Sequence, residues 1–419
     1  MAAPVIAPSA TLAVNERVQA RRAAGQQVLH LGFGEAGLPV LPAVGRVLAE
    51  AAPLTGYPPI AGTRAARAAA AGWFARRGLP TDPDQVVLAP GSKALLHALV
   101  TALPGDVVLP VPSWVSYAAQ AALAGKQVVG VPVPAAAGGV PDPDLLDGAL
   151  RRARAAGRDP GVLIVTLPDN PTGTVADEAL VRRVCAVAED HDLAIVSDEI
   201  YRDLSWARRP VTSPATVAPE RTIVTSGLSK SVGLGGWRIG FARFPDGARG
   251  ERARAAVVGV ASEVWSGLAA PMQEVAAYVL GEPAEVRAHV EAGRRLHQRV
   301  TTAVHGIVEA AGARCRPPQG AFYLYPDLEP ARARLAAGGV TTGEQLAAHL
   351  LDDHGVGVLP GAAFGDDPAA LRLRLATSLL HGRTDSERWT ALHHPDPLAL
   401  PWVASDLARL REVLHRLLG

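Results

Sequence analysis

The middle of the chain, from about residue 85 to 245, alternates short apolar runs with longer segments of helical periodicity. Each apolar run is rich in β-branched residues and is bounded by Gly, Pro or Asp, a pattern typical of buried strands. The seven runs are QVVLA (85–89), DVVLPV (106–111), QVVGVPV (127–133), GVLIVTLP (161–168), LAIVSDE (193–199), RTIVTS (221–226) and RIGFARF (238–244). Alanine-rich helical patterns lie between them at 93–103, 114–124, 142–156 and 177–190. The alternation predicts an α/β fold with a mainly parallel sheet flanked by helices.

The two ends of the chain have a different pattern. A helix-like arm opens the chain, and long helical stretches from about 247 to 311 precede the short apolar runs AFYLYP (321–326), VGVLP (356–360) and LRLRLATS (371–378). A chain of 419 residues is too long for one simple core. We therefore predict a large domain over 46–290 and a smaller α/β domain from 1–45 and 291–419, with an insertion at about 380–403.

Composition narrows the classes of partner. The 41 basic and 40 acidic residues leave a formal charge of +1 without long runs of one sign, which gives no support for a nucleic-acid or membrane partner. The longest uncharged run that could suggest a membrane span, 107–125, is interrupted by prolines and polar residues, so we do not expect it to span a membrane. Cys185 and Cys315 are far apart and lack metal-ligand spacing, which favours a reducing cytoplasm, with no disulfide framework and no metal site. Residues 1–14 lack the basic region of a secretory signal.

Lysine is scarce in this chain and therefore informative. The only three lysines are Lys93, Lys126 and Lys230, and lysine, unlike arginine, can lose its proton to act as an amine nucleophile. Lys230 follows the strand-like run RTIVTS, Asp198 ends LAIVSD, and Asn170 follows GVLIVTLP. The carboxyl ends of parallel strands meet at one edge of a sheet, so we expect these side chains to converge. An amine, a carboxylate and an amide together suit pyridoxal phosphate.

Three motifs carry a specific resemblance. The pattern S-K-x6-W-R-x-G at 229–240, with DNPTG at 169–173 and SDEIY at 197–201, resembles the class I aminotransferases of the fold-type-I pyridoxal phosphate enzymes, nearest to the bacterial aspartate and prephenate aminotransferases. Further matches are PSATLAVNERV (8–18), LGFGE (31–35), YPPIAGTRAAR (57–67), PGSKALLHAL (90–99), VPSWVSY (111–117), PPQGAFYLYPD (317–327) and LPGAAFG (359–365). The resemblance implies transfer of an amino group between an L-amino acid and a 2-oxo acid by a ping-pong Schiff-base mechanism.

The same resemblance implies roles around the cofactor ring. Lys230 would form the Schiff base and carry a proton between substrate and cofactor, and Asp198 would pair with the ring nitrogen. Asn170 and Tyr201 would bond the 3-oxygen, and Trp114 would stack on the ring. From the residues alone, Asp198 could equally be a turn cap, and Trp114 could be an ordinary core residue.

The phosphate would lie where the Gly91-Ser92-Lys93 turn opens a helix, because free amides and the positive end of the helix dipole attract anions. The resemblance implies that Ser229 and Arg238 complete the phosphate-binding site.

Tyr57 bears on the oligomeric state. The resemblance implies that Tyr57 contacts the cofactor phosphate of a neighbouring subunit, which implies a homodimer with shared active sites. Its place before two prolines is also compatible with an ordinary turn aromatic.

On the substrate side, a planar guanidinium can hold a carboxylate by two parallel hydrogen bonds. The family register favours Arg372 for this role over Arg374, its neighbour on the same strand face. Gly34 would let the carboxylate approach the backbone, and Asn170 and Trp114 would also border the substrate.

Lys93 gives the clue to specificity. In the similar subgroup, the lysine of the matching turn contacts a distal carboxylate of the substrate, and the arm at 9–11 covers the site. Lys93 could alternatively be a surface residue in the first turn of a helix. Residues 35–37 read Glu-Ala-Gly where the family usually has Glu-Pro-Asp.

Two other readings remain open at this point. The same cofactor and fold also support lyases, racemases and decarboxylases. A cofactor-binding regulator would need a DNA-binding module, for which the arm before Gly32 is too short.

Overall fold

The computed structural model describes residues 8–418. Residues 1–7 and Gly419, which belong to the predicted smaller domain, lie outside the described residues. Within 8–418, none of the helices is long and apolar enough to span a bilayer.

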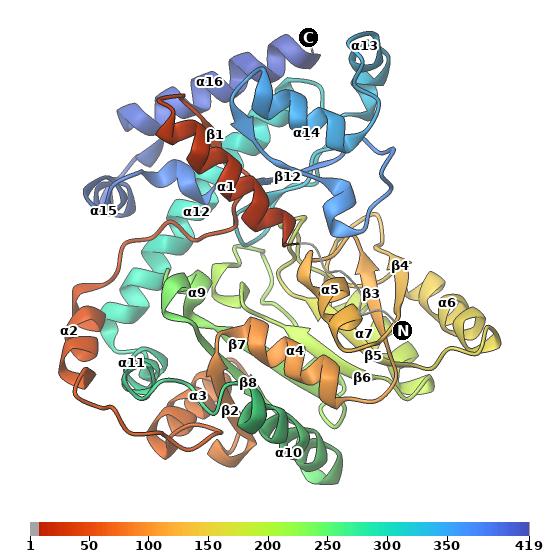
Figure 1. Cartoon of the computed structure of the whole chain (residues 1–419), viewed down its shortest axis with the longest axis vertical. Helices are drawn as coiled ribbons and strands as arrows, with labels where there is room; N and C mark the ends of the chain where they lie inside the picture. Colours follow the sequence, from red (N-terminus) through yellow and green to blue (C-terminus); the bar gives the residue numbers. More distant parts are fainter. Residues whose placement is uncertain (1–7, 419) are drawn as a thin grey trace.

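A seven-stranded sheet forms the centre of the molecule (Figure 1). Its strands are β2 (Val86–Pro90), β3 (Asp106–Val111), β4 (Val128–Pro132), β5 (Pro160–Thr166), β6 (Ala194–Asp198), β7 (Thr222–Gly227) and β8 (Ile239–Arg243). The order is β2-β8-β7-β6-β5-β3-β4, and β8 is antiparallel to both of its neighbours while the other pairs are parallel. The predicted mainly parallel sheet flanked by helices is confirmed.

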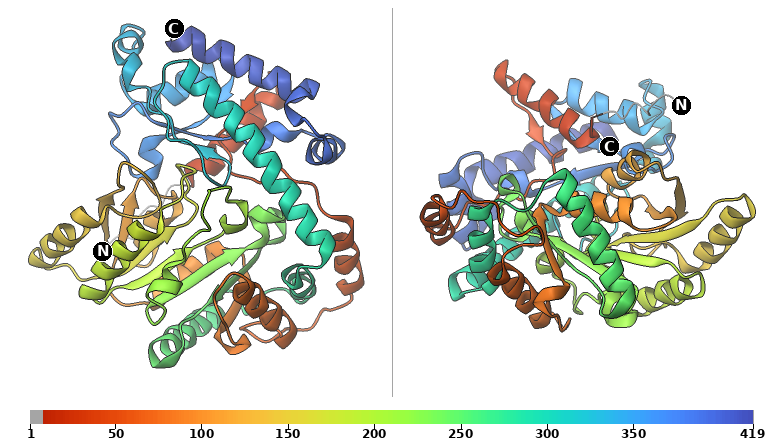
Figure 2. Two further views of the ribbon diagram at one scale, coloured as in Figure 1. Left: turned by 180° about the vertical axis from the view of Figure 1, so that it is seen from behind. Right: turned by 60° about the horizontal axis from the view of Figure 1, so that its bottom comes forward.

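Both faces of this sheet are covered, which explains why its strands are continuously apolar. In β5, Val162 and Ile164 point into a core shared with α4 (Ser92–Ala102) and α10 (Gly247–Val264). Leu163 and Val165 point into the opposite core with α6 (Pro143–Ala155) and α7 (Glu178–Asp190). The opposed views in Figures 1 and 2 show α4 and α7 on opposite faces.

Further helices surround the seven-stranded sheet or connect its strands. They are α2 (Pro42–Ala51), α3 (Arg64–Arg76), α5 (Ser116–Leu123), α8 (Pro214–Val217), α9 (Leu228–Ser231) and α11 (Ala270–Gly281).

The N-terminal arm and the C-terminal part of the chain pack together above this sheet (Figure 1). The arm contains α1 (Ala10–Ala23) and β1 (Leu29–His30), and β1 pairs in parallel with β10 (Val356–Gly357). A second, antiparallel sheet has the order β11 (Leu359–Pro360), β12 (Leu373–Ala376), β9 (Tyr323–Leu324). Its apolar face packs with α14 (Gly343–Asp352) and α16 (Pro401–Leu418). A short helix, α13 (Arg332–Ala337), precedes α14.

One long helix, α12 (Ala284–Ala310), passes without a break through the predicted domain boundary at residue 290. Its buried residues Leu296, Val300 and Val304 join the core of the smaller sheet. The predicted insertion contains α15 (Asp385–His393), which rests on α12. The domain limits at 45/46 and 290/291 stay predictions.

Candidate active site

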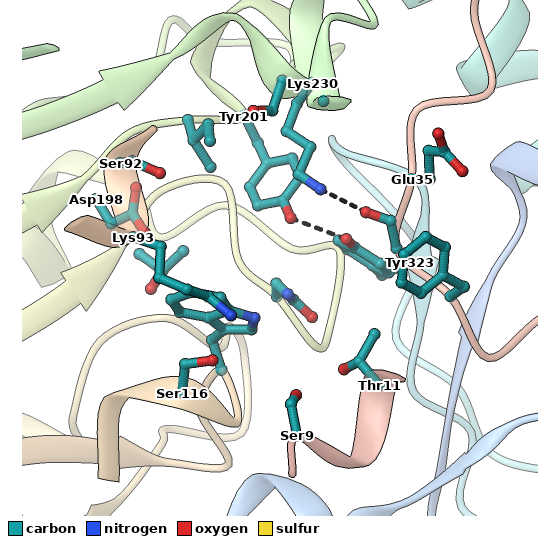
Figure 3. Close-up of a pocket in the computed structure, with 18 of the residues that line it drawn as sticks. Ser9, Thr11, Glu35, Ser92, Lys93, Ser116, Asp198, Tyr201, Lys230 and Tyr323 are labelled. Atoms are coloured by element: carbon teal, nitrogen blue, oxygen red, sulfur yellow. Dashed lines mark hydrogen bonds between the residues drawn. The ribbon is translucent and has the colours of Figure 1, made fainter. Parts of the chain in front are cut away.

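A cavity of about 520 Å³ opens above the carboxyl ends of β5, β6 and β7 (Figure 3). Its walls come from the arm, from loops of the seven-stranded sheet and from the smaller sheet. The predicted site residues that line it are Gly34, Ser92, Lys93, Trp114, Asn170, Asp198, Tyr201, Ser229, Lys230 and Arg238. The structure thus brings together residues from six separate sequence motifs.

Lys230 lies on the short helix α9, directly after β7. Its Nζ donates a hydrogen bond to the carbonyl oxygen of Gly34, as drawn in Figure 3. Burial lowers the pKa of Lys230 to about 8, and the positive charges of Arg374 and Arg238 act in the same direction. A substantial fraction of this amine is therefore neutral near pH 7 to 8, as a nucleophile or proton carrier requires.

Asp198 is the last residue of β6 and is almost fully buried. Its Oδ2 accepts a 2.8 Å hydrogen bond from the Tyr117 hydroxyl, and its Oδ1 accepts a 3.4 Å bond from Thr225 Oγ1. Burial raises the pKa of Asp198 to about 6, and the hydrogen bonds from Tyr117 and Thr225 oppose that rise. The carboxylate is held charged near neutral pH in a place where a protonated ring nitrogen could pair with it.

Tyr117 was missed by the sequence reasoning, although it lies within the quoted stretch VPSWVSY. It is fully buried, and its hydroxyl also lies 2.8 Å from Thr166 Oγ1. Its ring meets that of Trp114 edge to face with centroids 5.1 Å apart. Tyr117 comes three residues after Trp114 at the start of a helix, and this spacing could have indicated that the two side chains lie side by side.

An anion could bind at the amino end of α4. Gly91 precedes this helix with a φ of +84°, and a Cβ there would lie 2.3 Å from Arg238 Nη2. Glycine therefore leaves room for the guanidinium beside the free amides of the first helical turn. Arg238 itself is held in the left-handed region, with a φ of +54°. Ser92, which begins the helix, and Ser229 also line this end of the cavity.

Lys93 lines the same cavity near its mouth. Its Nζ lies 5.2 Å from the ring centroid of Trp114. Partial burial lowers the pKa of Lys93, and Arg238 adds to the effect by repulsion.

The prediction that Arg372 lies in the site is wrong. Arg372 comes just before β12 and forms ion pairs with Asp327 at 3.1 Å and Asp366 at 3.0 Å. Arg374 lines the cavity instead, and only 1 % of its surface is exposed. Two acidic side chains hold Arg372 outside, whereas the cavity-facing position belongs to the residue two further on.

The partners of Arg374 are neutral groups. It donates to the carbonyl oxygen of Gly32 and, at 3.5 Å, to Asn170 Oδ1, while its Nε has no partner among the described residues. Burial lowers the pKa of Arg374. A buried guanidinium without a carboxylate partner is suited to receive one from a substrate.

Tyr57 does not line the cavity, and 95 % of its surface is exposed. Its assigned contact with a neighbouring subunit stays a prediction.

The residues present fit pyridoxal phosphate. Lys230 offers a partly neutral amine, Asp198 offers a buried carboxylate, and Arg238 lies beside the amino end of α4. Within residues 8–418, no cluster of His, Cys, Asp or Glu could hold a metal ion.

Known proteins resemble this chain over most of its length. The sequence profile of aminotransferase class I and II matches residues 26–379. Aspartate aminotransferase from Geobacillus stearothermophilus is 34 % identical over 91 % of this chain and 95 % of its own. Aspartate/prephenate aminotransferase from Thermus thermophilus is also 34 % identical, with the same coverages of 91 % and 95 %. The solved structure of aspartate aminotransferase from Thermus thermophilus with maleate matches with a TM-score of 0.81 and 29 % identity, covering 97 % of each chain.

These matches confirm the resemblance carried by the motifs. They do not favour the lyase, racemase or decarboxylase alternative, since the relatives are aminotransferases.

Proposed function

The chain belongs to the class I and II aminotransferases, which use pyridoxal phosphate, and from this premise we propose that it transfers the amino group of an acidic L-amino acid, aspartate or glutamate, to a 2-oxo acid. The observation that carries the proposal is the convergence of Lys230, Asp198 and Arg374 in one cavity. When bound, pyridoxal phosphate supplies an aldehyde carbon for the amino group and a ring that withdraws electrons.

The chain's own side chains would divide the remaining work. Arg374 would bind the substrate α-carboxylate through two parallel hydrogen bonds. Lys230, partly neutral at working pH, would take the proton from the substrate α-carbon. Lys230 would then deliver this proton to the cofactor carbon that receives the amino group. Asp198 would keep a proton on the ring nitrogen, since its buried carboxylate is held in place by Tyr117 and Thr225.

Lys93 supports the choice of an acidic substrate. Its ammonium group lines the same cavity as Arg374 and would pair with a second, distal carboxylate. The relatives named aspartate aminotransferase and aspartate/prephenate aminotransferase are consistent with this choice.

The test follows the visible absorption band of the cofactor in the purified holoenzyme. We expect aspartate or glutamate to remove the band and the matching 2-oxo acid to restore it. A band that responds only to neutral amino acids would reject the acidic substrate, and a band that no amino acid changes would reject transamination.

Lys93→Met tests the distal contact. We expect kcat/KM for aspartate to fall by about tenfold, equivalent to about 1.4 kcal/mol, while neutral substrates change little. Lys126→Met is the matched control, because Lys126 contacts the Leu103 carbonyl and does not line the cavity. Equal losses for aspartate and for neutral substrates would contradict the role of Lys93.

We also propose a homodimer. The side chain of Tyr57, which precedes Pro58 and Pro59, is exposed and could contact a second subunit. Sedimentation of the wild-type protein should give the mass of two chains, and a monomer with full activity would contradict shared active sites.

A cytoplasmic location is part of the same proposal. Cys185 and Cys315 are both free thiols, which suits a reducing compartment. Fractionation of the source cells tests it.

A further inference from the structure

Tyr323 is a cavity residue whose role the motifs leave unassigned. It is the first residue of β9, and only 1 % of its surface is exposed. Its hydroxyl oxygen lies 2.8 Å from that of Tyr201, as Figure 3 shows. Tyr201 follows the central strand β6, so this bond joins the smaller sheet to the large one at the floor of the cavity.

The ring of Tyr323 supports Arg374. The Arg374 Cζ lies 4.9 Å from the centroid of this ring and 5.2 Å from that of Phe364. A buried guanidinium with only neutral hydrogen-bond partners gains stabilisation from aromatic faces. Both rings therefore lie within cation–π range of the guanidinium that would receive a carboxylate.

Gly34 shows how closely Tyr323 is fitted. A Cβ at Gly34 would lie 2.4 Å from the Tyr323 hydroxyl oxygen and 3.2 Å from its Cζ. The backbone angles of Gly34 lie outside the left-handed region, so the absence of a side chain serves this close approach. The carbonyl oxygen of the same glycine accepts the hydrogen bond from Lys230.

Hydrogen-bond counting gives the direction of the Tyr323–Tyr201 bond in the working site. A phenol has one proton to donate. If Tyr201 donates its proton into the cavity, toward the anionic 3-oxygen of the cofactor, its own oxygen must accept from Tyr323. A donor that also accepts a hydrogen bond is a stronger donor, because the two bonds polarise each other.

We propose that Tyr323 is a positioning residue with two separable parts: its ring holds Arg374 for the substrate carboxylate, and its hydroxyl strengthens Tyr201 as a hydrogen-bond donor. The inference rests on the proposed function. It places carboxylate recognition and cofactor tuning on one side chain.

Two substitutions separate the two parts. Tyr323→Phe keeps the ring and removes the hydroxyl, whereas Tyr323→Leu removes both. Tyr325→Phe is the matched control, because the Tyr325 hydroxyl donates to Asp366 at 2.8 Å and its side chain does not line the cavity.

The first readout is the affinity of the holoenzyme for succinate, an unreactive dicarboxylate, measured by calorimetry. We expect Tyr323→Leu to weaken binding roughly 3-fold to 30-fold, the range of a desolvated cation–π contact, and Tyr323→Phe to bind nearly as the wild type does. Unchanged binding in Tyr323→Leu would overturn the role of the ring.

The second readout is the pH midpoint of the visible absorption change of the holoenzyme. A weaker donor at the 3-oxygen stabilises the deprotonated cofactor less, so Tyr323→Phe should move this midpoint upward, and Tyr325→Phe should not. An unmoved midpoint in Tyr323→Phe would overturn the role of the hydroxyl, even where Tyr323→Leu fails to fold. If the wild type exchanges no amino group with any amino acid, the proposed function fails, while both comparisons of variants remain decisive.

Discussion

Replacement of Arg374 by leucine should abolish most substrate recognition and leave the fold intact. Arg374 is buried and makes hydrogen bonds to Gly32 and Asn170 without an acidic partner. Its removal therefore breaks no ion pair of the protein and relieves the cost of burying a charge. The loss appears only when a carboxylate must be bound.

The size of the loss follows from the two bonds that the guanidinium would give to a carboxylate. Hydrogen bonds to charged groups contribute about 1.5–3 kcal/mol each, so two of them contribute about 3–6 kcal/mol. With about 1.4 kcal/mol for each factor of ten, kcat/KM should fall by about 10² to 10⁴. The kcat/KM of Arg374→Lys should lie between those of the wild type and Arg374→Leu, because lysine keeps the positive charge but lacks the planar guanidinium.

The matched control is Arg372→Leu. Arg372 pairs with Asp327 and Asp366, and its side chain is 40 % exposed, so the cost should be about 1 kcal/mol of stability with little change in kcat/KM. The assay combines the rate of the amino-acid half-reaction over a range of concentrations with thermal unfolding. An inactive Arg372→Leu beside an active Arg374→Leu would refute the assignment.

Two further predictions concern buried titratable groups. Tyr117→Phe should raise the pKa of Asp198 above its value of about 6, because the hydrogen bond from Tyr117 lowers it; one bond to a charge corresponds to about 1–2 pH units. The acid limb of the pH profile of kcat/KM should move upward accordingly, and an unmoved limb would contradict the role of Tyr117. His297 is fully buried beside His381 with a ring separation of 4.7 Å, and burial lowers the pKa of His297 to about 3. Because the unfolded chain takes up a proton below about pH 6.5 and the folded chain does not, stability should fall as the pH drops from there toward 3. His297→Phe should make the acid dependence of the unfolding temperature less steep, and an identical dependence would count against this reading.

The seven central strands could be predicted because burial on both faces leaves a continuous apolar run that needs no knowledge of its neighbours. The predicted run 106–111 coincides with β3, and the others differ by one or two residues at their ends. The convergence of Asn170, Asp198 and Lys230 followed from the same logic, since β5, β6 and β7 are adjacent and parallel.

Arg372 and Arg374 could not be told apart in this way. Residues two apart in a strand share a face, so periodicity treats them alike. The deciding contacts of Arg372 are with Asp366, 6 positions before it, and with Asp327, 45 positions away. Strand periodicity gives no signal of either ion pair, because both depend on how the chain folds back around Arg372. The Tyr201–Tyr323 bond, between residues 122 positions apart, was invisible for the same reason.

The pairing of β1 with β10 has a consequence for biosynthesis. On the ribosome, β1 emerges long before β10, so Leu29 must wait for Val356 before its backbone finds a strand partner. The stretch from Gly91 to Arg238, which includes Lys230 and the amino end of α4, is complete long before Arg374 is translated and bonds to the carbonyl oxygen of Gly32. A nascent chain therefore acquires the residues that would hold the cofactor well before the arginine that would select what the cofactor acts on.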